Sequence, residues 1–277
     1  MSTQAVLQSR FGLSRTKRAH APSDVAAIRD GVVAWGSLIL GAIVWEVGGR
    51  LLDLSYLPPL SSVLSKLYEL TRSGVVLTNV TTSIINLAIG FGAAIVVGLV
   101  LGVLMARVRW VEEALDPYVY ALLTAPTVVF VPIYFSLFGL SRWAIVCLIF
   151  QYGVFIIVVN TVTAVRTVDV QLVEMARVFG ARTEWSVVRK VILPAALPLI
   201  SAGVRLGMGR CVKGMINGEI LIALVGLGGI SASFARAYDS EGVFAILLVV
   251  IIVAIVADGL VGLLDKRVNS WLPRNQR

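Results

Sequence analysis

The chain has 277 residues, 58% of them hydrophobic and 14% charged, with a formal net charge of +8 and a mean hydropathy of +0.89. Soluble domains are about 45–50% apolar and about 25% charged, so this composition excludes an ordinary soluble globular protein. Long apolar runs recur through most of the length and predict an all-α polytopic membrane protein. One histidine and two cysteines exclude a Cys/His metal site and a histidine-based triad, and we expect no enzyme active site on this chain.

Six apolar segments are long enough to cross about 30 Å of hydrocarbon. In chain order, the sequence predicts spans at 31–48, 83–105, 118–140, 143–165, 197–230 and 243–264. The second span is rich in glycine and alanine, which predicts close packing against another helix. The fifth is the least regular, because three cations and Glu219 interrupt it.

Lysine and arginine are distributed unequally across the expected membrane. With six spans, 16 of the 24 cations fall on the side of both termini, 5 on the other side and 3 inside the fifth span. We therefore expect both termini in the cytoplasm of a cell whose inner membrane holds the protein. Residues 1–30 are expected to form a basic cytoplasmic tail, not a cleaved signal peptide, that contacts solvent or anionic headgroups and no nucleic acid. Residues 31–272 form one transmembrane domain, and 273–277 a second cytoplasmic tail.

The fifth span carries the most chemical information. A cation at the bilayer centre costs about 2.5–3.5 kcal/mol, so these side chains must face water, another helix or each other. At about 100° per residue, Arg210, Lys213 and Asn217 share a stripe about 60° wide, beside Arg205 and Glu219. The first three are candidates for lining a translocation path, and the other two are candidates for structural ion pairs. Alternatively, all these charges form buried ion pairs and caps. A positive path favours an anionic solute.

A charged stretch, VEMARVFGARTEWSVVRKVILP, occupies residues 173–194 inside an expected loop at about 166–196. Asp169 and Gly180 predict the two ends of one short amphipathic helix, and Thr183 predicts the start of a second. Pro194 is expected to stop or kink the second helix before the next span. From the residues alone, two interpretations remain open: a segment lying on lipid headgroups, or a docking surface for a cytoplasmic partner.

Glu174-Met175-Ala176, Gly180 and Val191–Pro194 resemble the EAA loop of ABC importer permeases, which forms the helices that contact the ATPase subunit. Further stretches resemble the nitrate/sulfonate/taurine branch: LPPLSSVLSKL (57–67), LDPYVYALLTAPTVVFVPIYFSLFGLS (115–141), NTVTAVRTVD (160–169), PAALPLISAGVRLGMGR (194–210) and GLGGI (226–230). The resemblance covers roughly residues 55–272. It implies the type I ABC importer permease fold, six transmembrane helices with cytoplasmic coupling helices.

The resemblance assigns ATPase coupling to Glu174, Ala176, Gly180, Trp185 and Pro194. The sequence departs from the family by Met175 in the triplet and by one additional residue between Gly180 and Pro194, which suggests a longer turn between the coupling helices. In the fifth span the branch usually has two arginines and a later glutamate. Lys213 and Asn217 depart from the expected apolar or small residues, so they are candidates for discriminating between solutes.

No phosphate-binding loop of the form G-x-x-x-x-G-K-[ST] occurs in the sequence, so ATP hydrolysis is expected on another chain. The resemblance implies a homodimer of this chain, an ATPase dimer holding ATP and Mg²⁺, an extracytoplasmic solute-binding protein, and no cofactor on this chain. The expected solute is a small anion such as a sulfonate, taurine or nitrate; bicarbonate and a neutral heterocyclic precursor are alternatives.

Two other classes of protein stay open: a secondary transporter and a membrane scaffold. A secondary transporter would couple through interior acids, of which only Glu46 and Glu219 are counted, and it commonly shows a 3+3 repeat that is not evident here. A scaffold would not need a cationic fifth span. Both are therefore disfavoured.

Overall fold

The computed structural model describes residues 24–269, apart from 53, 55, 182, 223 and 224. The expected tail at 273–277 and most of the expected tail at 1–30 lie outside these residues. By its contacts the chain divides into two units, residues 1–54 and 55–277. The first contains α2 (Asp24–Leu52), which begins before the expected boundary at residue 31.

The second unit is helical throughout its described part. It contains α3 (Leu60–Arg72), α4 (Val75–Arg107), α5 (Arg109–Thr124), the 3-10 turn η1 (Thr127–Phe130), α6 (Val131–Phe138), α7 (Arg142–Arg166), α8 (Val170–Val178), α9 (Glu184–Val187), the π turn η2 (Val188–Ile192), α10 (Leu193–Ile222), α11 (Gly226–Arg236) and α12 (Ser240–Val268). Five described helices are long and apolar enough to cross a membrane, or six if a bent helix pair counts as one span.

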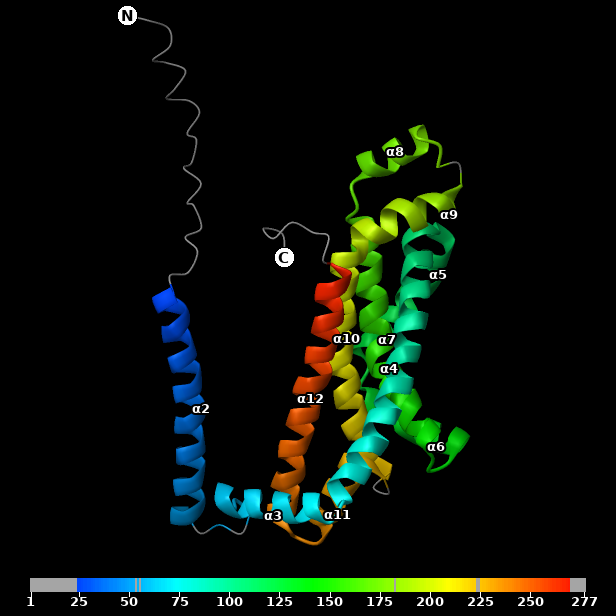
Figure 1. Cartoon of the computed structure of the whole chain (residues 1–277). Coiled ribbons are helices and arrows are strands. Elements are labelled where there is room, and N and C mark those ends of the chain that lie inside the picture. Colours follow the sequence, from blue (N-terminus) through cyan, green and yellow to red (C-terminus); the bar gives the residue numbers. More distant parts are fainter. Residues whose placement is uncertain (1–23, 53, 55, 182, 223–224, 270–277) are drawn as a thin grey trace, which may run out of the picture. The chain divides into compact units, whose positions relative to one another are not determined.

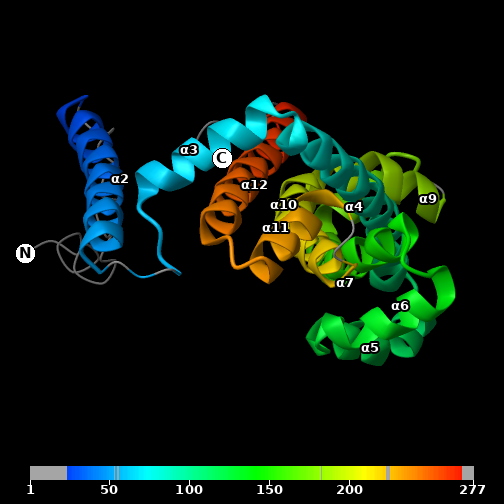
Figure 2. The same cartoon turned by 90° about the horizontal axis from the view of Figure 1, so that it is seen from below.

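The central helix of the second unit is α7, which packs along α4 and along α10. The long helices α4, α7, α10 and α12 form a bundle (Figure 1). The short helices α8 and α9 lie at one end of this bundle, here called the α8–α9 end, and α3 and α11 lie at the opposite end, the α3–α11 end (Figure 1). Figure 2 shows the bundle from the α3–α11 end. The bundle therefore exposes two different sets of short helices at its two ends.

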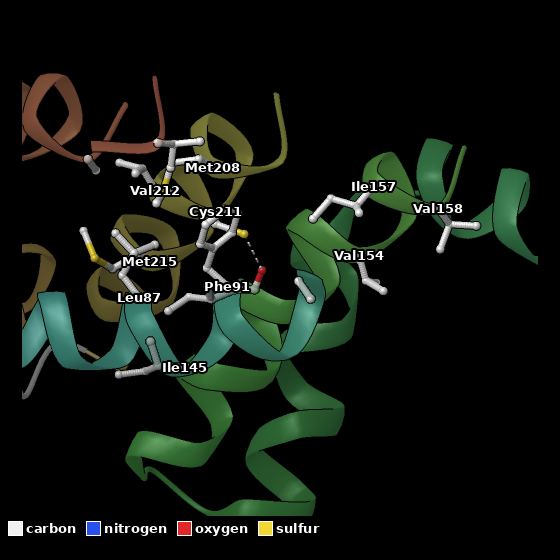
Figure 3. Close-up of a cluster of buried hydrophobic side chains, with 14 of the residues drawn as sticks. Leu87, Phe91, Ile145, Val154, Ile157, Val158, Met208, Cys211, Val212 and Met215 are labelled. Atoms are coloured by element: carbon white, nitrogen blue, oxygen red, sulfur yellow. Dashed lines mark hydrogen bonds between the residues drawn. The ribbon is translucent and has the colours of Figure 1, made fainter. Parts of the chain in front are cut away.

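Close contact between α4 and α7 depends on glycine. A Cβ added at Gly90, Gly98 or Gly102 would lie only 2.5–2.7 Å from a side-chain atom of α7. The close packing expected for the second span is therefore confirmed. Beside this seam, α4, α7 and α10 share an apolar cluster (Figure 3) in which the Cys211 thiol donates to the carbonyl of Ile149 (3.3 Å).

The expected third span, 118–140, is broken. α5 ends at Thr124, and η1 and α6 continue at an angle of 101° to it. Ala125 is extended (φ −60°, ψ 139°), as is usual before proline, and Pro126 supplies no N–H to continue the α5 hydrogen bonds. The expected third span therefore consists of two helical parts, α5 and η1–α6, that meet at a bend.

The expected fifth span, 197–230, differs at both ends. Pro194 does not stop the preceding helix, because α9, η2 and α10 form one continuous helical segment. Within it the Leu193 N–H donates to the Val188 carbonyl five residues back, the pattern of a π turn. This wider turn immediately precedes Pro194. At the other end α10 finishes at Ile222, and the glycine-rich GLGGI stretch begins the separate helix α11, with Gly226 at φ +77°.

Among the described residues of the second unit, cations of the two groups that the sequence separates lie at opposite ends. The C-terminal ends of α4, α7 and α12, which carry Arg107, Arg166 and Lys266, lie at the α8–α9 end (Figure 1). Arg72 and Arg236 end α3 and α11 at the other end. At the α3–α11 end a Lys66–Asp239 ion pair (3.2 Å) joins α3 to the start of α12.

Candidate functional site

Two cations of α10 line a polar cavity of about 360 Å³. Its walls are α10, which contributes Arg210 and Lys213, α7, which contributes Gln151 and Tyr152, and the chain around the bend after α5. Gln151 is only 6% exposed and accepts a hydrogen bond from the Tyr134 hydroxyl (2.6 Å). The break in α5–α6 thus creates one wall of a cavity that presents cationic and amide side chains together.

A second cavity, of about 420 Å³, lies between α10 and α12. Lys213 lines both cavities. Asn217 lines the second cavity, whose other lining side chains are mainly apolar. The Asn217 amide Nδ2 donates to the Tyr152 hydroxyl (2.9 Å), so an α10 residue of the second cavity is bonded to an α7 residue of the first. The structure therefore brings Arg210, Lys213 and Asn217 together around two cavities that share Lys213.

Arg205 forms an ion pair with α12. Its Nε and a terminal guanidinium nitrogen donate to the two carboxylate oxygens of Asp258, at 2.9 and 2.6 Å. Both side chains are about half exposed. Asp258 lies within the expected sixth span, so the count of Glu46 and Glu219 as the interior acids was wrong.

Glu219 is fully buried, and neutral donors take the place of the cation expected for it. Its Oε2 accepts hydrogen bonds from the Ser83 hydroxyl (2.8 Å) and the Gly228 N–H (3.0 Å), and the Ser83 Oγ accepts from the Leu227 N–H (2.9 Å). The carboxyl group thus caps the start of α11 and joins it to α4. Gly226 and Gly228 leave the necessary room, since an added Cβ would lie 2.3 and 2.7 Å from Glu219 atoms.

The cationic stripe is not buried within this single chain. Arg210 and Lys213 are exposed and Asn217 is partly exposed, although α10 is long and apolar enough to cross a membrane. Facing hydrocarbon would cost about 2.5–3.5 kcal/mol for each of the two cations. This face of α10 therefore lies against water or protein.

The two short helices of residues 170–187 have the caps that the sequence predicts. The Asp169 carboxylate accepts from the Gln171 N–H (2.9 Å) at the start of α8, and the Thr183 hydroxyl accepts from the Ser186 N–H (3.2 Å) at the start of α9. Gly180 follows α8 with φ +96°. The two caps and the first short helix are confirmed, whereas the second helix, α9, continues through η2 into α10. Residue 182 of the turn between α8 and α9 lies outside the described residues.

Large apolar side chains just after α8 and in α9 are exposed to solvent. Phe179 is 83% and Trp185 67% exposed, and Glu174 is exposed on the same helix pair. Ala176 is partly buried, and Pro194 lies beyond η2 in the first turn of α10. The coupling residues named from the sequence are therefore not gathered into one cluster; they spread over a protruding surface and the helix behind it.

Glu184 joins three helices at the α8–α9 end. Its two carboxylate oxygens each accept from one guanidinium, Oε2 from Arg107 at the end of α4 and Oε1 from Arg177 in the last turn of α8, both at 2.5 Å. The hydrogen bond from Arg107 and the positive charges of both arginines hold the pKa of the Glu184 carboxyl below its usual value. These three residues are called the arginine clasp below. Nearby, Arg166 of α7 pairs with Glu112 of α5.

Sequence reasoning missed several members of these sites. Gln151, Tyr152 and Asp258 are polar residues inside apolar spans, and that position was itself a signal. The sequence gives a weaker signal for the role of Glu184. Of its partners, Arg107 is distant in sequence and Arg177 lies on another helix. Charge patterning places these arginines on one side of the expected membrane without pairing them.

Residues 94–270 match the family model described as "Binding-protein-dependent transport system inner membrane component". The putative aliphatic sulfonates transport permease SsuC of Bacillus subtilis is 30% identical over 239 residues, covering 84% of this chain and 86% of that protein. The riboflavin transport system permease RibX of Chloroflexus aurantiacus is 29% identical (85% and 88% covered), and the nitrate import permease NrtB of Synechocystis sp. is 31% identical (69% and 66%).

The fold is that of a known ABC transporter. An inward-facing structure of the MetNI methionine ABC transporter superposes on this chain with a TM-score of 0.62 and 19% identity, covering 69% of this chain and 95% of that one. Both the helical architecture and the family match agree with the type I importer permease fold implied by the sequence. The chain belongs to the family of binding-protein-dependent transport system inner membrane components, the multi-pass permease subunits of ABC importers.

Proposed function

We propose that this chain forms the translocation path for a small anionic solute in an ATP-driven importer. The observation that carries the proposal is the stripe of Arg210, Lys213 and Asn217, which lines two adjoining cavities on α10, a helix long and apolar enough to cross a membrane. A path lined by cations attracts anions and repels cations of similar size. Gln151 and Tyr152 add neutral hydrogen-bonding groups that suit a polyatomic anion.

Relatives support this class of solute without agreeing on one compound. SsuC is named for aliphatic sulfonates and NrtB for nitrate, both of which are anionic. RibX is named for riboflavin, which keeps a neutral heterocyclic solute as the alternative. The mainly apolar walls of the α10–α12 cavity would accommodate the body of either kind of organic solute.

Energy comes, in this proposal, from a separate ATPase that binds the α8–α9 surface and holds ATP and Mg²⁺. Exposed Phe179 and Trp185 provide the apolar contacts that a protein partner buries. The cationic ends of α4, α7 and α12 at the same end support a cytoplasmic location for this surface and for the C-terminus. Two copies of the chain enclose the path, both N-termini are cytoplasmic, and a solute-binding protein docks on the α3–α11 end.

Removing the Lys213 ammonium tests the proposed path. Lys213→Ala is expected to lower ATP-dependent anion uptake about ten-fold or more, since a hydrogen bond to a charged group contributes about 1.5–3 kcal/mol. Uptake of labelled taurine, nitrate and bicarbonate by cells measures the change, with Lys266→Ala, an exposed lysine near the end of α12, as the matched control. Unchanged rate and unchanged preference among the anions in Lys213→Ala would contradict the proposal.

A further inference from the structure

The arginine clasp links the two short helices to a transmembrane helix that does not follow them in the chain. Glu184 is the first residue of α9, Arg177 lies in the last turn of α8, and Arg107 is the last residue of α4. Each Glu184 oxygen accepts from one of the two arginines, at 2.5 Å. A single carboxylate therefore bridges two arginines that would otherwise repel each other.

Packing fixes α9 but leaves α8 weakly held. Val187 of α9 and Val188 and Ile192 of η2 are buried in an apolar cluster with the end of α7. No residue of α8 is buried, and Val173 is its one side chain described as packed against that cluster. The position of α8 relative to α9 and α4 therefore depends largely on polar contacts. The Arg177–Glu184 ion pair is the side-chain contact that joins α8 directly to α9.

The other end of the clasp reaches a rigid element. α4 is locked against α7 by glycine contacts along much of its length, including Gly98 and Gly102. A displacement applied at Arg107 is therefore expected to move α4 as a whole. The middle part of α4 borders the apolar cluster that it shares with α10. Without the clasp, movement of α8 and α9 would reach the bundle chiefly through the continuous helix α9–η2–α10.

We propose that Glu184 is a positioning residue that transmits movement of α8 and α9 to α4, a second mechanical connection beside η2 and α10. The inference rests on the proposed coupling of this surface to an ATPase. The clasp side chains are partly exposed, with Glu184 at 63%, and exposed ion pairs add little to stability. Its loss should therefore disturb coupling while leaving folding intact.

The test measures how accessible the proposed path is to a labelling reagent in two nucleotide states of the ATPase. The parent protein carries Cys147→Ala, Cys211→Ala and Asn217→Cys, so that position 217 holds its only thiol. In the purified permease–ATPase complex this thiol is labelled with a membrane-impermeant maleimide, once without nucleotide and once with ATP plus vanadate. ATP should change the labelling rate at least about five-fold, the low end of ordinary coupling between sites. With Glu184→Gln added, the change should fall below about two-fold while ATP hydrolysis and ATPase co-elution persist.

Two further variants separate the clasp from a general charge effect. Glu113→Gln removes a carboxylate that pairs with Arg109 (2.8 Å) at the same end and should behave like the parent. Reversing all three charges, Glu184→Arg with Arg107→Glu and Arg177→Glu, rebuilds the clasp and should restore at least half of the nucleotide response.

The outcomes distinguish this inference from the proposed function. If ATP leaves the parent labelling rate unchanged, the proposed coupling itself is wrong, and the clasp with it. If the parent responds and Glu184→Gln responds equally, or the triple reversal restores nothing, only the role of the clasp is contradicted. Loss of ATPase co-elution in Glu184→Gln would also overturn it, by placing Glu184 in the ATPase interface.

Discussion

At the scale of single residues, the buried carboxyl of Glu219 is held by several hydrogen bonds. It accepts from Ser83 and from the backbone at the start of α11, so replacing it would leave donors without acceptors in the interior. Each such group costs about 1–3 kcal/mol. Two glycines of the GLGGI stretch make this arrangement possible, because a side chain at Gly226 or Gly228 would occupy the space of Glu219.

Gly226→Ala tests this close approach. Its Cβ would lie 2.3 Å from the Glu219 carboxyl carbon, and the residue sits at φ +77°. We expect a loss of about 3 kcal/mol or more in the free energy of unfolding, measured by thermal or denaturant unfolding in detergent. The control is Gly74→Ala, at φ +79° with nothing within 4 Å, which should lose only about 1–2 kcal/mol of backbone strain. Equal losses in the two variants would contradict the steric account.

Residue patterns predicted which α10 side chains share a face, because helical geometry alone fixes their angles. They did not predict the partners of those side chains. Arg205 pairs with Asp258, 53 residues away, and Glu219 accepts from Ser83, 136 residues away. A single sequence gives no pairing signal over such separations. Tyr152 and Gln151 were visible as polar residues in an apolar span, but their place beside Arg210 depends on how α7 packs on α10.

At the scale of helices, two breaks shape the cavities and the coupling surface. Pro126 ends α5 and turns the following segment by 101°, which opens the polar cavity. η2 lies between Gly180 and Pro194, where the sequence predicts one residue more than the family spacing. A π turn can hold one additional residue within a helix. Composition and hydropathy cannot reveal either feature, since both segments are apolar enough for straight helices.

The seam between α4 and α7 gives a matched pair of glycine variants. A Cβ at Gly98 would lie 2.7 Å from Ile157, whereas one at Gly92, on the same helix, meets nothing within 4 Å. Gly98→Ala should therefore lower the free energy of unfolding by about 1–3 kcal/mol through overpacking, and Gly92→Ala should raise it by up to about 1 kcal/mol through helix propensity. Unfolding midpoints of both variants check the difference, and a stabilised Gly98→Ala would show that the two helices do not approach this closely.

At the scale of the whole molecule, the sequence predicts much of the architecture. Composition predicts a helical membrane protein, charge separates two ends that the bundle keeps apart, and capping residues locate α8 and α9 within a residue or two. Tertiary packing decides the remainder: the bend after α5, the separate α11, and the clasp that joins α4 to α9. These features depend on contacts between segments far apart in the sequence.

The central claim is that the stripe on α10 faces an aqueous path. Membrane-impermeant maleimide labelling of single cysteines, in the background without Cys147 and Cys211, tests it most directly. Lys213→Cys and Asn217→Cys should be labelled in sealed vesicles or cells from at least one side, because the thiolate forms only in water. Val96→Cys, 63% exposed in the apolar middle of α4, should stay unlabelled. Labelling of neither stripe position, with the protein folded and inserted, would contradict the account.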